Sequence, residues 1–100
     1  MATKKRPAKK EMAVIVTTPT RDVWYGRTTD PNATPLVLTG ARHCYQWGTQ
    51  RGIGQLAASG PGRGAKIGEC VGEVRVREVA CVLLCSDEAS AALDGATWAR

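Results

Sequence analysis

One hundred residues predict a single domain, and the sequence has no run of about 18 apolar residues that would predict a membrane-spanning helix. The formal net charge of +5 at pH 7 comes mostly from residues 1–10, which hold five of the fourteen basic residues and no acid. The remainder is nearly neutral, so the charge does not predict a nucleic-acid-binding surface on the folded part.

Residues 1–11 predict a disordered basic tail, because they offer few apolar side chains to bury. Such a tail either keeps the chain soluble or touches nucleic-acid phosphates without sequence preference. Residues 12–100 form the one predicted domain. Its four cysteines lack the C-x-x-C spacing of a zinc site. The charged start also lacks the apolar segment of a secretory signal, so we expect reduced thiols.

The first half of the domain predicts four strands and a helical turn. β-Branched and aromatic residues dominate the strands. Pro19 and Thr20 form a turn between the first two strands, and Gly40 separates the last two. Two glycines weaken the helical turn. The strands cover residues 12–18, 22–28, 35–39 and 41–47, and the helical turn covers residues 52–59.

The longest predicted strand, residues 72–85, changes its pattern part-way. Two valines first alternate with Arg75 and Arg77, so the arginines share one face. From Val79 onward the segment is continuously apolar, and we expect both of its faces to be buried there. Before it, residues 66–70 predict a brief strand.

A helix follows the longest strand. Ser86 can cap it, Asp87 and Glu88 lie in its first turn, and Gly95 ends it. Together these elements predict an α+β, mainly β fold: a small bent or half-barrel antiparallel sheet of five or six strands with two short helices.

Two glycine-rich segments match nucleotide-binding motifs only in part. Residues 52–57, GIGQLA, match G-x-G-x-x-A, but the neighbouring strands are predicted to be antiparallel, whereas the dinucleotide motif needs a parallel βαβ unit. Residues 60–66, GPGRGAK, lack the G-K-[ST] ending of a P-loop. The second segment is either a solvated turn or a loop whose backbone N–H groups cradle a phosphate.

The fourth predicted strand carries the most informative side chains. When it is extended, Tyr45 and Trp47 share a face with His43, and Arg42 lies on the opposite face. The rings can stack on a base or pack in the core, and the guanidinium can bind a phosphate in bidentate fashion. His43 and Cys44 point to opposite faces, so they do not predict a nucleophile–base pair.

Short motifs follow one another in a distinctive order along residues 14–98. They are V-I-V, W-Y-G, L-V-L, A-R, Y-Q-W, L-A-A-S-G, the long apolar strand, and S-D-E-A before Trp98. In this order and spacing the chain resembles the phage anti-Thoeris sponge family. It departs from the family at Gln46, where members often carry tyrosine, and in the tail before Glu11.

The resemblance implies an anti-defence binding protein and not an enzyme. Members bind cyclic ADP-ribose signals of the Thoeris defence system, such as glycocyclic ADP-ribose, in the host cytoplasm and hold them intact. Their pockets lie between protomers of dimers that commonly assemble into hexamers. Some relatives also hold cyclic di- or trinucleotides of CBASS defence. Sequestration needs no metal, cofactor or catalytic group, and we expect no membrane or nucleic-acid partner.

For the ligand site we expect Arg42 to bind phosphate and Tyr45 or Trp47 to stack on the base. The further candidate ligand-binding residues are Trp24, Tyr25, Arg75, Arg77 and Trp98. The alternative function is a phage structural or accessory protein, whose aromatic residues form core and whose basic tail touches DNA.

Overall fold

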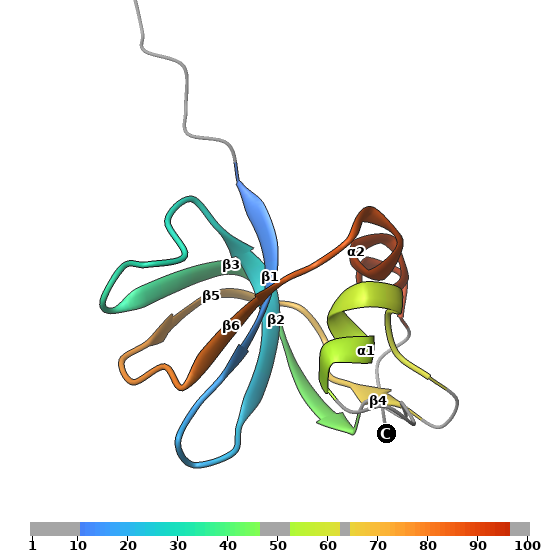
Figure 1. Ribbon diagram of the computed structural model, residues 1–100, viewed down its shortest axis with the longest axis horizontal. Coiled ribbons are helices and arrows are strands. Elements are labelled where there is room, and N and C mark those ends of the chain that lie inside the picture. The colour runs from blue at the N-terminus through green and yellow to red at the C-terminus, as the bar shows by residue number, and fades with distance from the viewer. Residues whose placement is uncertain (1–10, 47–52, 63–64, 97–100) are drawn as a thin grey trace, which may run out of the picture.

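The computed structural model describes residues 11–46, 53–62 and 65–96, which contain six strands and two helices (Figure 1). Most of the predicted basic tail, together with Trp47 and Trp98, lies outside the described residues. The strands are β1 (Met12–Thr17), β2 (Val23–Thr28), β3 (Leu36–Gln46), β4 (Lys66–Ile67), β5 (Val71–Val76) and β6 (Cys81–Leu84). The helices are α1 (Ile53–Ser59) and α2 (Asp87–Asp94). Neither helix is long and apolar enough to cross a membrane.

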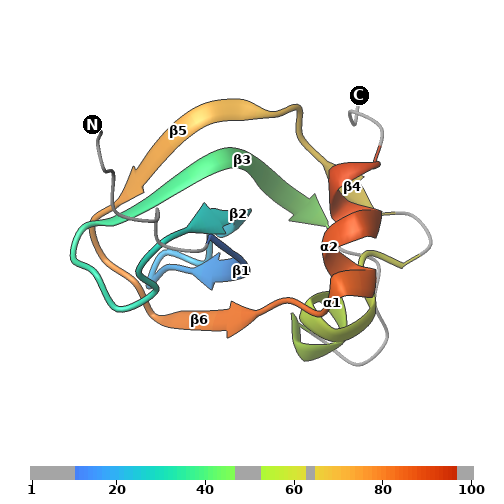
Figure 2. The ribbon, with the colours of Figure 1, turned by 90° about the horizontal axis from the view of Figure 1, so that it is seen from above.

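The six strands form one open antiparallel sheet. Its order is β4–β3–β2–β1–β6, and β5 pairs with β3 at the edge that β4 also uses. Figure 2 shows β5 and β6 on opposite sides of the sheet, with both helices gathered at one end. These observations confirm the predicted α+β, mainly β fold with a bent antiparallel sheet and two short helices, and the sheet does not close into a barrel.

Strand β3 corrects the prediction of two strands separated at Gly40. It is continuous because Gly40 adopts a φ of 57°, which glycine reaches without steric cost. The register with β2 shifts between Tyr25 and Arg27, so β3 contains one extra residue at this point. The bulge bends the strand without ending it.

The predicted single strand at residues 72–85 is also wrong, since β5 and β6 are separate. β5 pairs with β3, and β6 pairs with β1 at the other edge of the sheet. The chain must therefore turn between Val76 and Cys81 to reach the second edge. The expected burial of both faces fails as well, because Leu84 is 61% exposed and Val79 37% exposed.

Each face of the sheet carries its own hydrophobic core. Alternation along β1 directs Ile15 towards the helices and directs Val14 and Val16 to the other face. The helix-side core is built on Ile15, Tyr25, Cys44, Leu56, Ile67 and Leu93. The second core lies within the bend of the sheet and is built on Val14, Val16, Leu36, Leu38, Ala41 and Val76.

Helix α2 has the ends that the sequence predicts. The Ser86 hydroxyl accepts a hydrogen bond from the Ala89 N–H at 3.0 Å, and Asp87 and Glu88 occupy the first turn. At the other end the Gly95 N–H donates to the Ala91 carbonyl oxygen at 3.1 Å. The predicted cap residues are therefore confirmed.

Candidate functional site

Three of the predicted ligand-binding residues line one cleft of about 500 Å³. Trp24 comes from β2, while Arg75 and Arg77 come from β5 and from the corner that leads to β6. The turn between β1 and β2, at residues 18–20, forms the opposite wall. A volume of this size falls in the range of small-molecule binding sites.

Trp24 is held at the cleft by its neighbours on the sheet. Its ring centroid lies 4.7 Å from that of His43, the residue directly opposite on β3, with an angle of 41° between the ring planes. The His43 Nε2 lies 3.8 Å from an Asp22 carboxylate oxygen. Trp24 is partly buried and lines the cleft, so a flat aromatic surface borders the open volume.

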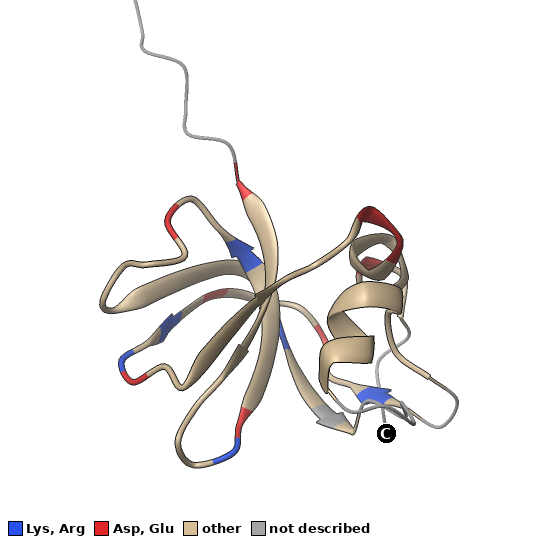
Figure 3. Ribbon diagram, viewed as in Figure 1, with Lys and Arg blue, Asp and Glu red and all other residues tan. Residues whose placement is uncertain are grey.

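Of the charged side chains that line the cleft, one forms an ion pair and two have no bonding partner within the described residues. The Arg75 Nε donates to the Glu73 carboxylate at 2.8 Å. Within the described residues, Arg77 and Glu78 make neither a hydrogen bond nor an ion pair through their side chains. Figure 3 shows basic and acidic residues following each other around the corner between β5 and β6. The cleft thus offers one unengaged guanidinium and one unengaged carboxylate beside an aromatic ring.

Arg42 lies elsewhere and serves the fold. It is 7% exposed, its Nε donates to the Gly68 carbonyl oxygen at 2.6 Å, and its Nη1 donates to the Leu93 carbonyl oxygen at 2.8 Å. The second bond ties β3 to the last turn of α2, where a positive charge also complements the helix dipole. We therefore expect Arg42 to support the fold and another cation to bind a ligand phosphate.

Tyr25 is fully buried in a polar network that holds α2 against the sheet. Its hydroxyl donates to an Asp94 carboxylate oxygen at 2.8 Å, and Arg27 donates to both oxygens of the same carboxylate at 3.0 and 2.6 Å. Tyr25 therefore acts in the fold and does not line the cleft. Sequence reasoning missed Arg27 and Asp94 because these residues are 67 positions apart and no local pattern links them.

The chain matches a family model over residues 11–93: a domain of unknown function, DUF6948. The chain belongs to this family. No curated protein and no solved structure matches it. The match runs from the residue before β1 into the last turn of α2, so every wall of the cleft lies inside the family domain.

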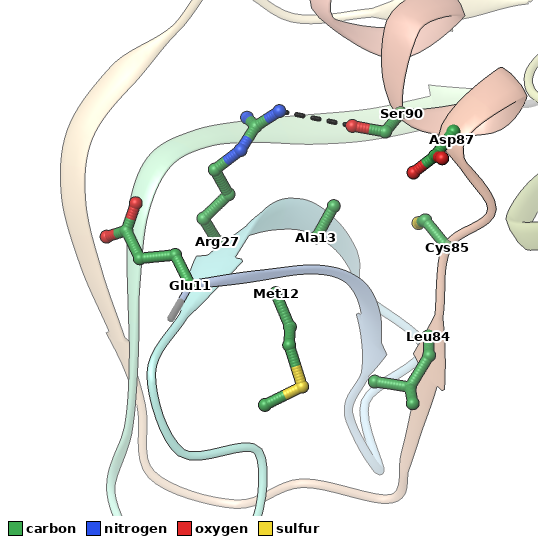
Figure 4. A pocket seen from close by; sticks show the side chains of 8 residues that line it. All are labelled: Glu11, Met12, Ala13, Arg27, Leu84, Cys85, Asp87 and Ser90. Atoms are coloured by element: carbon green, nitrogen blue, oxygen red, sulfur yellow. Dashed lines mark hydrogen bonds between the residues drawn. The ribbon is translucent and has the colours of Figure 1, made fainter. Parts of the chain in front are cut away.

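A second cleft of about 370 Å³ opens between β1, β6 and the start of α2 (Figure 4). Arg27 lines it but is held by Asp94, and it also donates to the Ser90 hydroxyl at 3.1 Å. The other charged groups that line this cleft are the carboxylates of Glu11 and Asp87, which have no ionic partner among the described residues. It contains no residue that the sequence predicted for ligand binding, and its charge is unsuited to a phosphate.

The free energy of unfolding should fall as the pH rises from about 9 to about 12. Burial raises the pKa of the Tyr25 hydroxyl to about 12 from its ordinary 10.0, and the pKa of the Cys85 thiol to about 11 from 9.0. As the pH rises, the unfolded chain loses these two protons at a lower pH than the folded chain does. The stabilisation is thus complete below the unfolded values and disappears as the pH passes the folded ones.

Urea unfolding at several pH values tests this expectation. The transition midpoint of the parent should decline steadily through this alkaline range, and Tyr25→Phe should decline less steeply because it removes one of the titrating groups. An equal decline in both proteins would show that the Tyr25 hydroxyl does not contribute.

Proposed function

We propose that the chain is a phage anti-defence sponge, which binds cyclic nucleotide immune signals in the host cytoplasm and holds them intact. Glycocyclic ADP-ribose is the first ligand to consider, and CBASS cyclic di- and trinucleotides come next. The observation that carries this proposal is the cleft whose lining includes both Trp24 and an unengaged Arg77.

The chemistry of the cleft suits a nucleotide. The Trp24 ring can stack on adenine, and the Arg77 guanidinium can bind the pyrophosphate through two parallel hydrogen bonds. The Glu78 carboxylate can accept hydrogen bonds from ribose hydroxyls. The Thr18 and Thr20 hydroxyls on the opposite wall bond to each other and to Asp22, and their remaining lone pairs can accept further hydrogen bonds.

Sequestration needs affinity and no reaction. Among the described residues, the lining of the cleft includes neither histidine nor cysteine. The Glu78 carboxylate in this lining forms no ion pair within the described part of the chain. A sponge acts by mass action, so it must bind tightly and be present in excess of the signal. A nanomolar dissociation constant corresponds to about −12 kcal/mol. We therefore propose a binding protein rather than an enzyme, assembled as a homo-oligomer.

Calorimetric titration of the full chain with glycocyclic ADP-ribose and with cyclic di- and trinucleotides tests the proposal. We expect at least one ligand to bind, and Arg77→Ala to weaken its binding at least about tenfold, which corresponds to about 1.4 kcal/mol. Lys66→Ala is the matched control, because Lys66 is an exposed cation on β4, outside the cleft lining. It should bind like the parent.

Mass analysis of the ligand after denaturing the complex completes the test. A sponge returns the ligand unchanged, whereas an altered ligand would identify an enzyme. Absence of binding to every ligand would favour the alternative, a phage structural or accessory protein. Equal binding by Arg77→Ala and the parent would remove the cleft as the site.

A further inference from the structure

Strand β6 has one edge without a partner strand in the described part of the chain. It pairs with β1 on its other edge. Residues 79–85 contain no charge and no proline, and Leu84 is 61% exposed. Soluble proteins usually protect such an edge with charges, proline or a covering element. An edge strand that carries neither a charge nor a proline is therefore typical of a surface that another strand covers.

The hydrogen-bonding pattern identifies which backbone groups of β6 are free. The Cys85 N–H donates to the Ala13 carbonyl oxygen at 2.9 Å, so Cys85 faces β1. Because hydrogen-bonding residues alternate along an antiparallel strand, Cys81 and Leu83 also face β1. The N–H and C=O groups of Val82 and Leu84 therefore point to the open edge.

We propose that β6 pairs with the same strand of a second copy of this chain, about a two-fold axis at Leu83. Val82 then lies opposite the partner's Leu84, and the two strands exchange all the backbone hydrogen bonds that their open edges offer. An antiparallel pair is self-complementary under two-fold symmetry. The proposal deepens the assembly part of the proposed function, and it holds whether or not a nucleotide binds.

In each neighbouring register, one backbone N–H group that the pairing needs is already bonded within its own chain. A shift of one step would pair Leu84 with the partner's Ala80, whose N–H already donates to Thr17 within its own chain at 2.8 Å. A shift in the opposite direction would pair Val82 with the partner's Ser86, whose N–H already donates to Ala57 at 2.9 Å. Only the register centred on Leu83 joins free groups at both positions.

Charge complementarity favours a second copy over an unrelated strand. Antiparallel pairing of β6 brings the corner that precedes one strand, with Arg77, to the end at which the partner's α2 begins with Asp87 and Glu88. Within the described residues of one chain, none of these three side chains has an ionic partner. Glu78 lies in the same corner, and its charge offsets part of this attraction.

The register predicts that two native cysteines, Cys81 and Cys85, can form a disulfide between the two copies of the chain. It places Cys81 opposite the partner's Cys85 in a pair without hydrogen bonds, where Cα atoms are about 4.5 Å apart. This separation lies within the range of about 4.4–6.8 Å that a disulfide spans. Within one chain the same two residues are about 13 Å apart along the strand, too far to be joined.

Mild oxidation of the full chain with copper–phenanthroline, without ligand, tests the proposal. We expect a covalent dimer on a non-reducing gel and a peptide that joins Cys81 to Cys85. Cys81→Ser and Cys85→Ser should each abolish this peptide, whereas Cys70→Ser, at an exposed cysteine outside β6, should leave it unchanged. A dimer linked only through Cys70, or no covalent dimer, would overturn the proposed pairing.

Light scattering with Leu84→Lys provides a second test that does not depend on oxidation. Leu84 is largely exposed in one chain, so the variant should keep the parent's circular dichroism spectrum while its mass falls from a dimer or larger assembly to a monomer at micromolar concentration. A parent that is monomeric, or a variant that keeps the parent's mass, would contradict the proposal. Neither result bears on nucleotide binding, which is measured separately.

Discussion

Replacing Arg42 by alanine should lower the free energy of unfolding by about 3 kcal/mol. Hydrogen bonds to a charged group contribute about 1.5–3 kcal/mol, and each buried acceptor left without a partner costs about 1–3 kcal/mol. Arg42 supplies donors to two carbonyl oxygens, those of Gly68 and Leu93. The desolvation of the buried charge offsets part of this sum, so the expected loss is smaller than two full contributions.

The position of Arg42 explains why the whole domain should respond. Its two bonds connect β3 to α2 and to the segment between β4 and β5. A loss of this size corresponds to a fall in Tm of more than about 10 °C for a domain of 100 residues. Ligand capture by this variant would then fail through unfolding and not through a missing phosphate contact.

Urea unfolding of Arg42→Ala and Arg75→Ala separates these roles. Arg75 has a side chain that is 68% exposed, and its ion pair with Glu73 lies at the surface. Such pairs contribute little, so Arg75→Ala should stay within about 0.5 kcal/mol of the parent. If Arg42→Ala matched Arg75→Ala, the buried arginine would not be supporting the fold.

Replacing Gly60 by alanine should cost about 2–4 kcal/mol, because it combines backbone strain with a steric clash. Gly60 follows α1 with a φ of 94°, a conformation that disfavours any side chain. A Cβ at this position would lie 2.8 Å from the Ala92 Cβ on α2. The Ala92 methyl group cannot rotate away, so the two helices would have to separate, and overpacking typically costs about 1–3 kcal/mol.

Gly54→Ala is the matched control and should act in the opposite direction. Gly54 lies inside α1, and a Cβ there would meet no atom within 4 Å. Alanine is favoured over glycine in a helix by about 0.5–1 kcal/mol, so this variant should be more stable than the parent. Chemical unfolding of both variants measures the change in the free energy of unfolding, which should have opposite signs for the two substitutions. A Gly60→Ala protein as stable as the parent would contradict the close contact of α1 with α2.

Features that depend on neighbouring residues were predictable from the sequence. The α2 caps follow from Ser86 and Gly95, whose partners lie within four residues. The alternation of β1 and β2 and the turn at Pro19 are likewise local, and their predicted positions are close to the observed ones. The fold class follows from adding such local elements together.

The sequence predicted residues that line the cleft, but it did not predict that they lie together. Trp24, Arg75 and Arg77 were among the predicted ligand-binding residues, but about 50 positions separate the tryptophan from the arginines. Their meeting depends on β5 pairing with β3 while β3 pairs with β2. No local pattern specifies which strands become neighbours, because pairing energy comes from contacts made after the chain has folded back on itself.

The sequence by itself determined the capped helix, the strand alternation and the residue types that suit a nucleotide. Tertiary structure decided whether β3 is one strand, where the long apolar segment divides, and that Arg42 is buried under α2. The physical reason is the range of the interactions. Capping and alternation act within a few residues. By contrast, the burial of a guanidinium and the choice of a sheet edge depend on partners that only the folded chain brings together.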